Sequence, residues 1–180
     1  IGLLSIPHSG EVLPVEFSPY LIEDIKHLMQ DVDFRVNELI NIDELNEAGV
    51  CVIKSHIIRT AVDLNRAPEQ SVINWKKNSK GIQLEKSPMG HALEKKLAAK
   101  YHTPYFEMMK SIIDQLKGTY PKVSIIDLHS MPSEATDYHM KINPNQSKTR
   151  PDFCVSDISG VSASSEFIGD VIGSLQKSYA

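Results

Sequence analysis

Short apolar runs alternate with amphipathic stretches along the chain, and this alternation predicts strands followed by helices. An apolar run over 3–6 predicts a first strand, and the β-branched run "VCVIKSHI" after Gly49 predicts a second. The clearest strand is expected within "KVSIIDLHS", which leads into Asp127 and His129. Two shorter segments, "TAVDL" and "DFCVSD", are candidates for further strands.

Helical periodicity marks four regions. Residues 19–45 carry apolar side chains at helical spacing, and "SPMGHALEKKLAAKYH" begins with Ser87, a plausible N-cap. The stretch "TPYFEMMKSIIDQLKG" has Pro104 at the first helical position and Gly118 at its end, as helices often do. "SSEFIGDVIGSLQKSY" predicts a closing helix, whereas "NRAPEQSVINWKKNSKG" predicts a surface loop.

The order of these elements, β-α-β-β-α-β-α, favours a three-layer α/β/α domain. A length of 180 residues suits one domain over 1–180. The polar motifs follow the predicted strands, and folds of this class bind their ligands at strand ends.

Composition narrows the possible partners. The 19 basic residues are outnumbered by 23 acidic ones without a basic stripe, which argues against nucleic acid, and no apolar stretch is long enough to cross a bilayer.

Cys51 and Cys154 lie in short apolar runs and are expected to be buried, reduced thiols. A cytoplasmic location is expected, although a signal removed before Ile1 is compatible with the sequence. Nothing indicates an oligomeric state.

His8 and Glu11 follow the first predicted strand in "PHSGE". A histidine and a glutamate three residues apart can supply two ligands to one metal ion, or can be polar residues of an exposed turn. The same spacing occurs at His91 and Glu94, within a lysine- and alanine-rich helical stretch, where a solvated helix face is the expected reading.

His129 supplies a second imidazole from the end of another predicted strand. Metal-bound imidazoles usually donate their other N–H to a carboxylate or a carbonyl, and Asp127 is a candidate for that role. The alternative is a histidine that only caps the strand.

The segment "HIIRTAVDLNRAP" adds Arg59, Asn65 and Arg66 near the same sheet edge. Arginine binds a carboxylate through two parallel charge-assisted hydrogen bonds, which suits an acidic substrate, but two arginines in surface salt bridges would give the same pattern. Asp63 is expected to orient an arginine or to cap a turn.

Five motifs together resemble the N-formylglutamate amidohydrolase family, a branch of the zinc carboxypeptidase and aspartoacylase superfamily. They occur in family order over nearly the whole chain and read "PHSGE", "RTAVDLNRAP", "YHTPYFEMM", "IIDLHS" and "TRPDFCVSD". The resemblance implies a carboxypeptidase-like fold with a mixed central sheet.

The same resemblance implies a chemistry. Zn²⁺ would be bound by His8, Glu11 and His129, whereas Arg59, Asn65 and Arg66 would hold the substrate carboxylate and polarise the scissile carbonyl. The expected reaction is hydrolysis of the amide of an N-acylated acidic amino acid, such as N-formyl-L-glutamate, to formate and glutamate, with Arg59 assisting catalysis.

Two departures from the family pattern bear on this expectation. Phe106 stands where family members often have a histidine, and the general-base glutamate of a late strand has no equivalent before Ala180, since Glu166 opens a predicted helix. The chain is therefore expected to lack its last strands, or to bind metal without efficient turnover. A peptide carboxypeptidase or deacylase and a non-catalytic metal-binding domain are the alternative functions.

Overall fold

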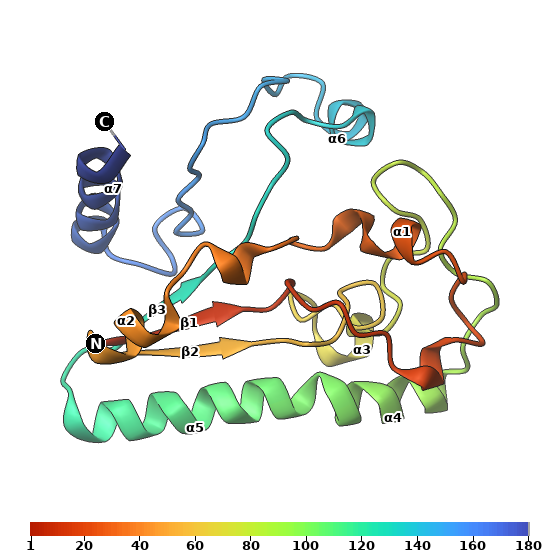
Figure 1. Ribbon diagram of the computed structural model, residues 1–180, viewed down its shortest axis with the longest axis horizontal. Coiled ribbons are helices and arrows are strands. Elements are labelled where there is room, and N and C mark those ends of the chain that lie inside the picture. Colours follow the sequence, from red (N-terminus) through yellow and green to blue (C-terminus); the bar gives the residue numbers. More distant parts are fainter. Residues whose placement is uncertain (180) are drawn as a thin grey trace.

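A parallel sheet of three strands forms the centre of the computed structural model, which describes residues 1–179 (Figure 1). The strands are β1 (Gly2–Ile6), β2 (Val50–Lys54) and β3 (Ser124–Asp127), in the order β2-β1-β3. The three principal strand predictions are confirmed. The strands pair only in parallel within the described residues, so a mixed sheet is not observed there.

The central strand β1 sets the register of its neighbours. Gly2 pairs with both Val50 and Ser124, and Ser5 pairs with Asp127. Because the three strands run in the same direction, the segments that follow them leave from one edge of the sheet. That edge is where the polar motifs of the sequence meet.

Alternate side chains of β1 enter two apolar clusters. Leu3 packs in the larger cluster with side chains of α4 (His91–Tyr101) and α5 (Thr103–Thr119), which run along one face of the sheet (Figure 1). Leu4 and Ile6 join a second cluster with side chains from the region around α2 (Ile42–Glu47). The central strand β1 is thus covered on both faces, as expected for parallel strands, whereas Ile125 and Ile126 of β3 are exposed. The complete three-layer arrangement stays a prediction.

The continuous helix predicted over 19–45 is wrong. The region from Val15 contains short helical pieces, namely η1 (Val15–Phe17), α1 (Ile25–Leu28), η2 (Met29–Asp31), η3 (Val36–Glu38) and α2. Asp24 and Asn41 each cap a new helix with a side-chain oxygen, and Arg35 has a φ of 60°, which a right-handed helix does not permit. These interruptions allow the turn that contains Asp33 to reach the sheet edge.

Four other local predictions are wrong. "TAVDL" forms turns with an isolated bridge between Val62 and Val72, and "DFCVSD" forms no strand in the described chain. The stretch predicted as a surface loop contains α3 (Pro68–Ser71), and it buries Val72 and Ile73 in the larger cluster. Helix α4 begins after Gly90, so Ser87 is not its N-cap.

Beyond β3 the chain passes through α6 (Asp137–Ile142) to the closing helix α7 (Ser165–Tyr179), which lies apart from α4 and α5 (Figure 1). Both cysteines are free thiols, Cys51 half-buried and Cys154 exposed, so the expectation of two buried thiols is wrong for Cys154 and holds only in part for Cys51. Among residues 1–179, no helix combines the length and the apolar character that crossing a membrane requires.

Gly10 lies where the backbone of the segment after β1 packs directly against the backbone of the segment after β2. It forms a parallel bridge with Ile58, and a Cβ atom there would lie 2.4 Å from the carbonyl oxygen of Ile57 and 2.5 Å from the carbonyl carbon of His56. Backbone atoms cannot give way as a flexible side chain can. The close approach therefore requires glycine.

We expect Gly10→Ala to lower the free energy of unfolding by about 3 kcal/mol, at the upper end of the cost of forced overpacking. Urea unfolding followed by circular dichroism measures the change. The control is Gly118→Ala in α5, where a Cβ meets nothing within 4 Å and a gain of up to about 1 kcal/mol is expected. Equal stability of Gly10→Ala and the unmodified protein would contradict the packing argument.

Candidate metal centre and active site

Two histidines meet at the edge where the strands end. His8 follows β1 and His129 follows β3, and their ring centroids are 4.9 Å apart. The parallel register explains this proximity, because it carries both strand ends to the same edge. The predicted proximity of the two imidazoles is confirmed.

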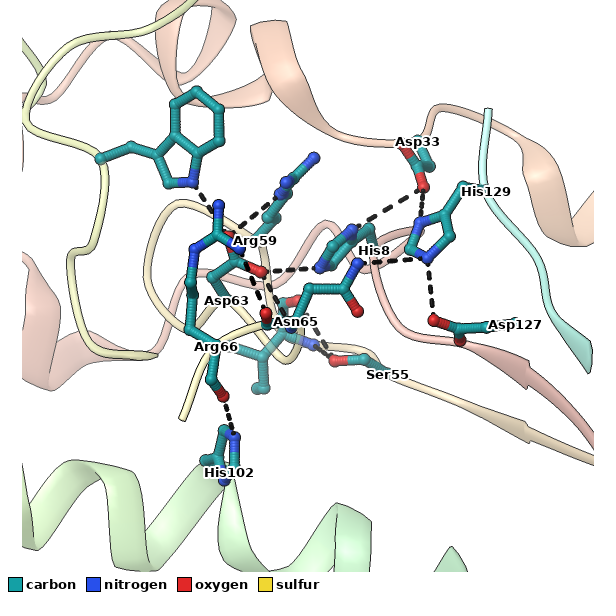
Figure 2. A network of polar contacts seen from close by, with 12 residues as sticks. His8, Asp33, Ser55, Arg59, Asp63, Asn65, Arg66, His102, Asp127 and His129 are labelled. Carbon is teal, nitrogen blue, oxygen red and sulfur yellow. Dashed lines mark hydrogen bonds and ion pairs between the residues drawn. The ribbon is translucent and has the colours of Figure 1, made fainter. Parts of the chain in front are cut away.

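Asp33 lies beside both rings. Its Oδ2 atom is 2.9 Å from His129 Nδ1 and 3.9 Å from His8 Nδ1 (Figure 2). The Asp33 backbone N–H donates to the carbonyl of His8 at 2.9 Å, which ties the turn after η2 to the segment after β1. Within residues 1–179, His8, Asp33 and His129 form the one group of at least three potential metal ligands whose donor atoms lie within 4.8 Å of one another.

His8 is completely buried, and one of its ring nitrogens has no hydrogen-bond partner. Its Nε2 lies 2.9 Å from Asp63 Oδ1, and because a carboxylate can only accept, Nε2 carries the hydrogen. The unpartnered Nδ1 then presents a lone pair. Burial lowers the pKa of His8 and outweighs the hydrogen bond to Asp63, which favours this neutral form.

His129 is held between two carboxylates. Its Nε2 lies 3.0 Å from Asp127 Oδ2, and its Nδ1 contacts Asp33 (Figure 2). Burial alone would lower the pKa of His129, but the hydrogen bonds to Asp127 and Asp33 outweigh burial and raise it to about 9. The predicted contact between Asp127 and His129 is confirmed. The amide nitrogen of Asn65 is 3.3 Å from the same Nε2.

The structure does not bring Glu11 into this group. Glu11 is exposed, and the bridges of Gly10 and Val12 to the segment after β2 lie on either side of it. These bridges hold residues 10–12 extended, and side chains alternate in an extended chain, so Glu11 points away from the side to which Gly10 and Val12 face. Its role as a metal ligand stays a prediction.

The second pair with the same spacing, His91 and Glu94, is an exposed ion pair of 3.5 Å on α4, as predicted.

Asp63 connects the histidines to the arginine-containing segment. Besides His8, Asp63 accepts from the backbone N–H of Asn65 and from Trp75 Nε1–H, each at 2.9 Å, and its Oδ2 is 3.5 Å from Arg59 Nε. Burial alone would raise the pKa of Asp63, but the hydrogen bond from His8 and the charge of Arg59 hold it well below its usual range. The expectation that Asp63 orients an arginine and caps a turn is confirmed.

The three predicted substrate-binding residues lie beside the histidine pair. Arg59 rests on the Trp75 ring, with its guanidinium carbon 5.1 Å from the ring centroid, and Arg66 is exposed and donates to the Asn65 carbonyl at 3.2 Å. Figure 2 shows both arginines on one side of His8, with His129 on the other and Asn65 between them. Two cationic side chains thus lie on one side of the potential metal ligands.

Sequence reasoning missed three residues of this site. Asp33 was hidden inside a region predicted as helix, and Trp75 inside a predicted surface loop. The buried His102 Nε2 donates to the Arg66 carbonyl at 2.9 Å, and its ring stacks on Phe106 at 4.7 Å. The motif "YHTPYFEMM" pointed to this helix start without giving its role.

Comparison with known proteins identifies the family of this chain and a solved structure with a similar fold. A sequence model of the family described as N-formylglutamate amidohydrolase (FGase) matches residues 2–180, and the chain belongs to this family. A crystal structure of N-formylglutamate amidohydrolase from Ralstonia eutropha JMP134 is similar in fold, with a TM-score of 0.81 and 18% sequence identity. The similarity covers 98% of this chain and 68% of that chain. A search of curated proteins found no match.

We expect Asp63→Asn to lower the free energy of unfolding by about 3 kcal/mol, because it removes a buried charge that Arg59 faces and places an amide among N–H donors. Urea unfolding measures the change. The control, Glu38→Gln, breaks an exposed ion pair with Arg35 and should leave the free energy of unfolding almost unchanged. Equal losses of unfolding free energy in both variants would contradict the conclusion that the buried charge of Asp63 stabilises the fold.

Proposed function

We propose that this protein is a zinc-dependent amidohydrolase that cleaves the amide of an N-acylated acidic amino acid, such as N-formyl-L-glutamate, to formate and glutamate. The observation that carries the proposal is the buried lone pair of His8 Nδ1, which has no hydrogen-bond partner and lies beside Asp33 and His129. A buried acceptor without a donor is costly, and a cation would satisfy it.

The donor set suits zinc. Two imidazoles and one carboxylate are a common set of protein ligands in catalytic zinc sites, where a fourth position stays open. Asp63 and Asp127 accept from the Nε2 atoms of His8 and His129. The free lone pair of His8 Nδ1 is available to a metal ion, whereas His129 Nδ1 would give up to binding the proton that it directs at Asp33. When bound, Zn²⁺ supplies the Lewis acid that polarises a carbonyl and activates water at neutral pH.

The residues of the arginine-containing segment are suited to an anionic substrate. Asp63 and the Trp75 ring hold the Arg59 guanidinium next to the histidine pair, where it can polarise the scissile carbonyl. Arg66, exposed at the rim, is available for the substrate carboxylate, and Asn65 lies between it and His129. His102 Nε2 donates to the backbone carbonyl of Arg66 and so fixes the backbone at that residue.

The first test separates metal binding from substrate binding. His129→Ala should lose zinc, because it removes one of three ligands, whereas Arg66→Ala should retain zinc and bind N-formylglutamate roughly 10- to 100-fold more weakly, the cost of a charged hydrogen bond. Metal analysis of the purified variants and calorimetric titration with N-formylglutamate measure the two effects.

The control for this test is His91→Ala, which removes the exposed histidine of α4 and should leave zinc content and substrate binding unchanged. Stoichiometric zinc in His129→Ala would refute the metal site. Parallel assays with N-formylglutamate and with short peptides distinguish the proposed reaction from peptide hydrolysis, and bound zinc without formate release would favour the non-catalytic alternative.

A second test decides the identity of the carboxylate ligand. Asp33→Ala should reduce zinc content strongly, since it removes the oxygen that lies between the two rings, whereas Glu11→Gln should leave zinc content unchanged. Metal analysis after dialysis against a mild chelator provides the comparison. The opposite pattern would support the original expectation that Glu11 is the ligand.

A further inference from the structure

Two hydroxyl groups form a line from α5 across the sheet to Asp127. The hydroxyl of Tyr105 lies 2.9 Å from Ser5 Oγ, and Ser5 Oγ donates to Asp127 Oδ1 at 2.6 Å. The other oxygen of Asp127 contacts His129 Nε2. The line therefore joins a helix on one face of the sheet to an imidazole at the strand ends, over three consecutive hydrogen bonds.

The direction of each hydrogen bond follows from the carboxylate. An ionised Asp127 can only accept, and its Oδ1 and Oδ2 lie 2.6 Å from Ser5 Oγ and 3.0 Å from His129 Nε2, respectively. Ser5 uses its single hydrogen on Asp127, so it accepts from Tyr105. A carbonyl of Ile53 lies 3.5 Å from the Tyr105 hydroxyl, which is a much weaker alternative.

Burial makes this arrangement specific. Ser5 is 1% exposed and Tyr105 is 9% exposed, on the face of β1 where Leu3 packs against the helices. Burial raises the pKa of Tyr105 to about 12, so the phenol keeps its hydrogen at physiological pH. Polar groups in an apolar layer are costly unless they are paired, and here each hydroxyl has a partner.

Asp127 needs such a restraint. Its side chain is 45% exposed, so water could solvate the carboxylate in other orientations. Ser5 is its register partner on β1 and occupies Oδ1, which leaves Oδ2 directed at His129. Because the outer partner of a metal-binding imidazole sets the orientation of the ring, the orientation of Asp127 is transmitted to His129 Nδ1.

We propose that Ser5 and Tyr105 are positioning residues that fix the Asp127 carboxylate and thereby direct His129 Nδ1 at the metal. This inference rests on the proposed zinc site. Neither residue touches the reacting atoms, and their contribution is to limit the rotation of Asp127 and of the imidazole that it holds.

The experiment compares Tyr105→Phe and Ser5→Ala with the unmodified protein. Zinc affinity is measured by chelator competition, and the Nε2–H proton signal of His129 is recorded by NMR in metal-free protein with ¹⁵N-labelled histidine. Ser5→Ala should weaken zinc binding roughly tenfold, the lower end of the effect expected for residues that support a ligand, and Tyr105→Phe less so. Both variants should lose the Nε2–H signal through faster exchange with water.

The matched control is Tyr101→Phe on the neighbouring helix α4. It removes a hydroxyl that donates to Glu16 at 2.9 Å and takes no part in the hydrogen bonds between Tyr105, Ser5 and Asp127. It should change neither measurement. Unchanged zinc affinity and an unchanged His129 signal in Tyr105→Phe would overturn the inference, as would equal effects in Tyr101→Phe. If the unmodified protein binds no zinc, the proposed function fails, and the NMR comparison alone decides whether the hydroxyl line positions Asp127.

Discussion

The parallel pairing of β1 with both of its neighbours is the constraint on which the site depends. Opposite strand directions would send the segment after β3 to the far edge, and His8 and His129 could not lie 4.9 Å apart. The same register places Ser5 beside Asp127. One arrangement of three short strands therefore determines both the pair of imidazoles and the contact that supports one of them.

The charges around the imidazoles follow a repeated pattern. His8 and His129 each direct Nε2 toward a carboxylate, Asp63 and Asp127 respectively, and Nδ1 toward Asp33. Three carboxylates around one neutral imidazole, His8, and one protonated imidazole, His129, leave an excess of negative charge, which favours a divalent cation at the centre. Arg59, whose Nε is 3.5 Å from Asp63 Oδ2, neutralises part of this charge.

The sequence predicted the parts of this structure that local patterns determine. The three strands and the bounds of α5 and α7 follow from apolar runs and turn residues, and the positions of His8 and His129 follow from the strands. Asp33 could not be predicted in the same way, because its position depends on interruptions at Asn41 and Arg35 within an apolar pattern typical of a helix. Glu11 is the opposite case, a residue that the sequence pattern suggested and the structure does not bring to the site. A histidine and a glutamate three residues apart suit one helical turn, but the bridges of Gly10 and Val12 to the segment after β2 keep Glu11 in extended backbone.

The chain contains a single tryptophan, and the fold places it within the site. Trp75 donates its indole N–H to Asp63 and lies against the guanidinium of Arg59, so its surroundings change whenever either charge moves. All indole fluorescence of the protein therefore originates next to the histidine pair. Emission from the native protein reports occupancy of this region without an added label, and it is not diluted by a second indole elsewhere.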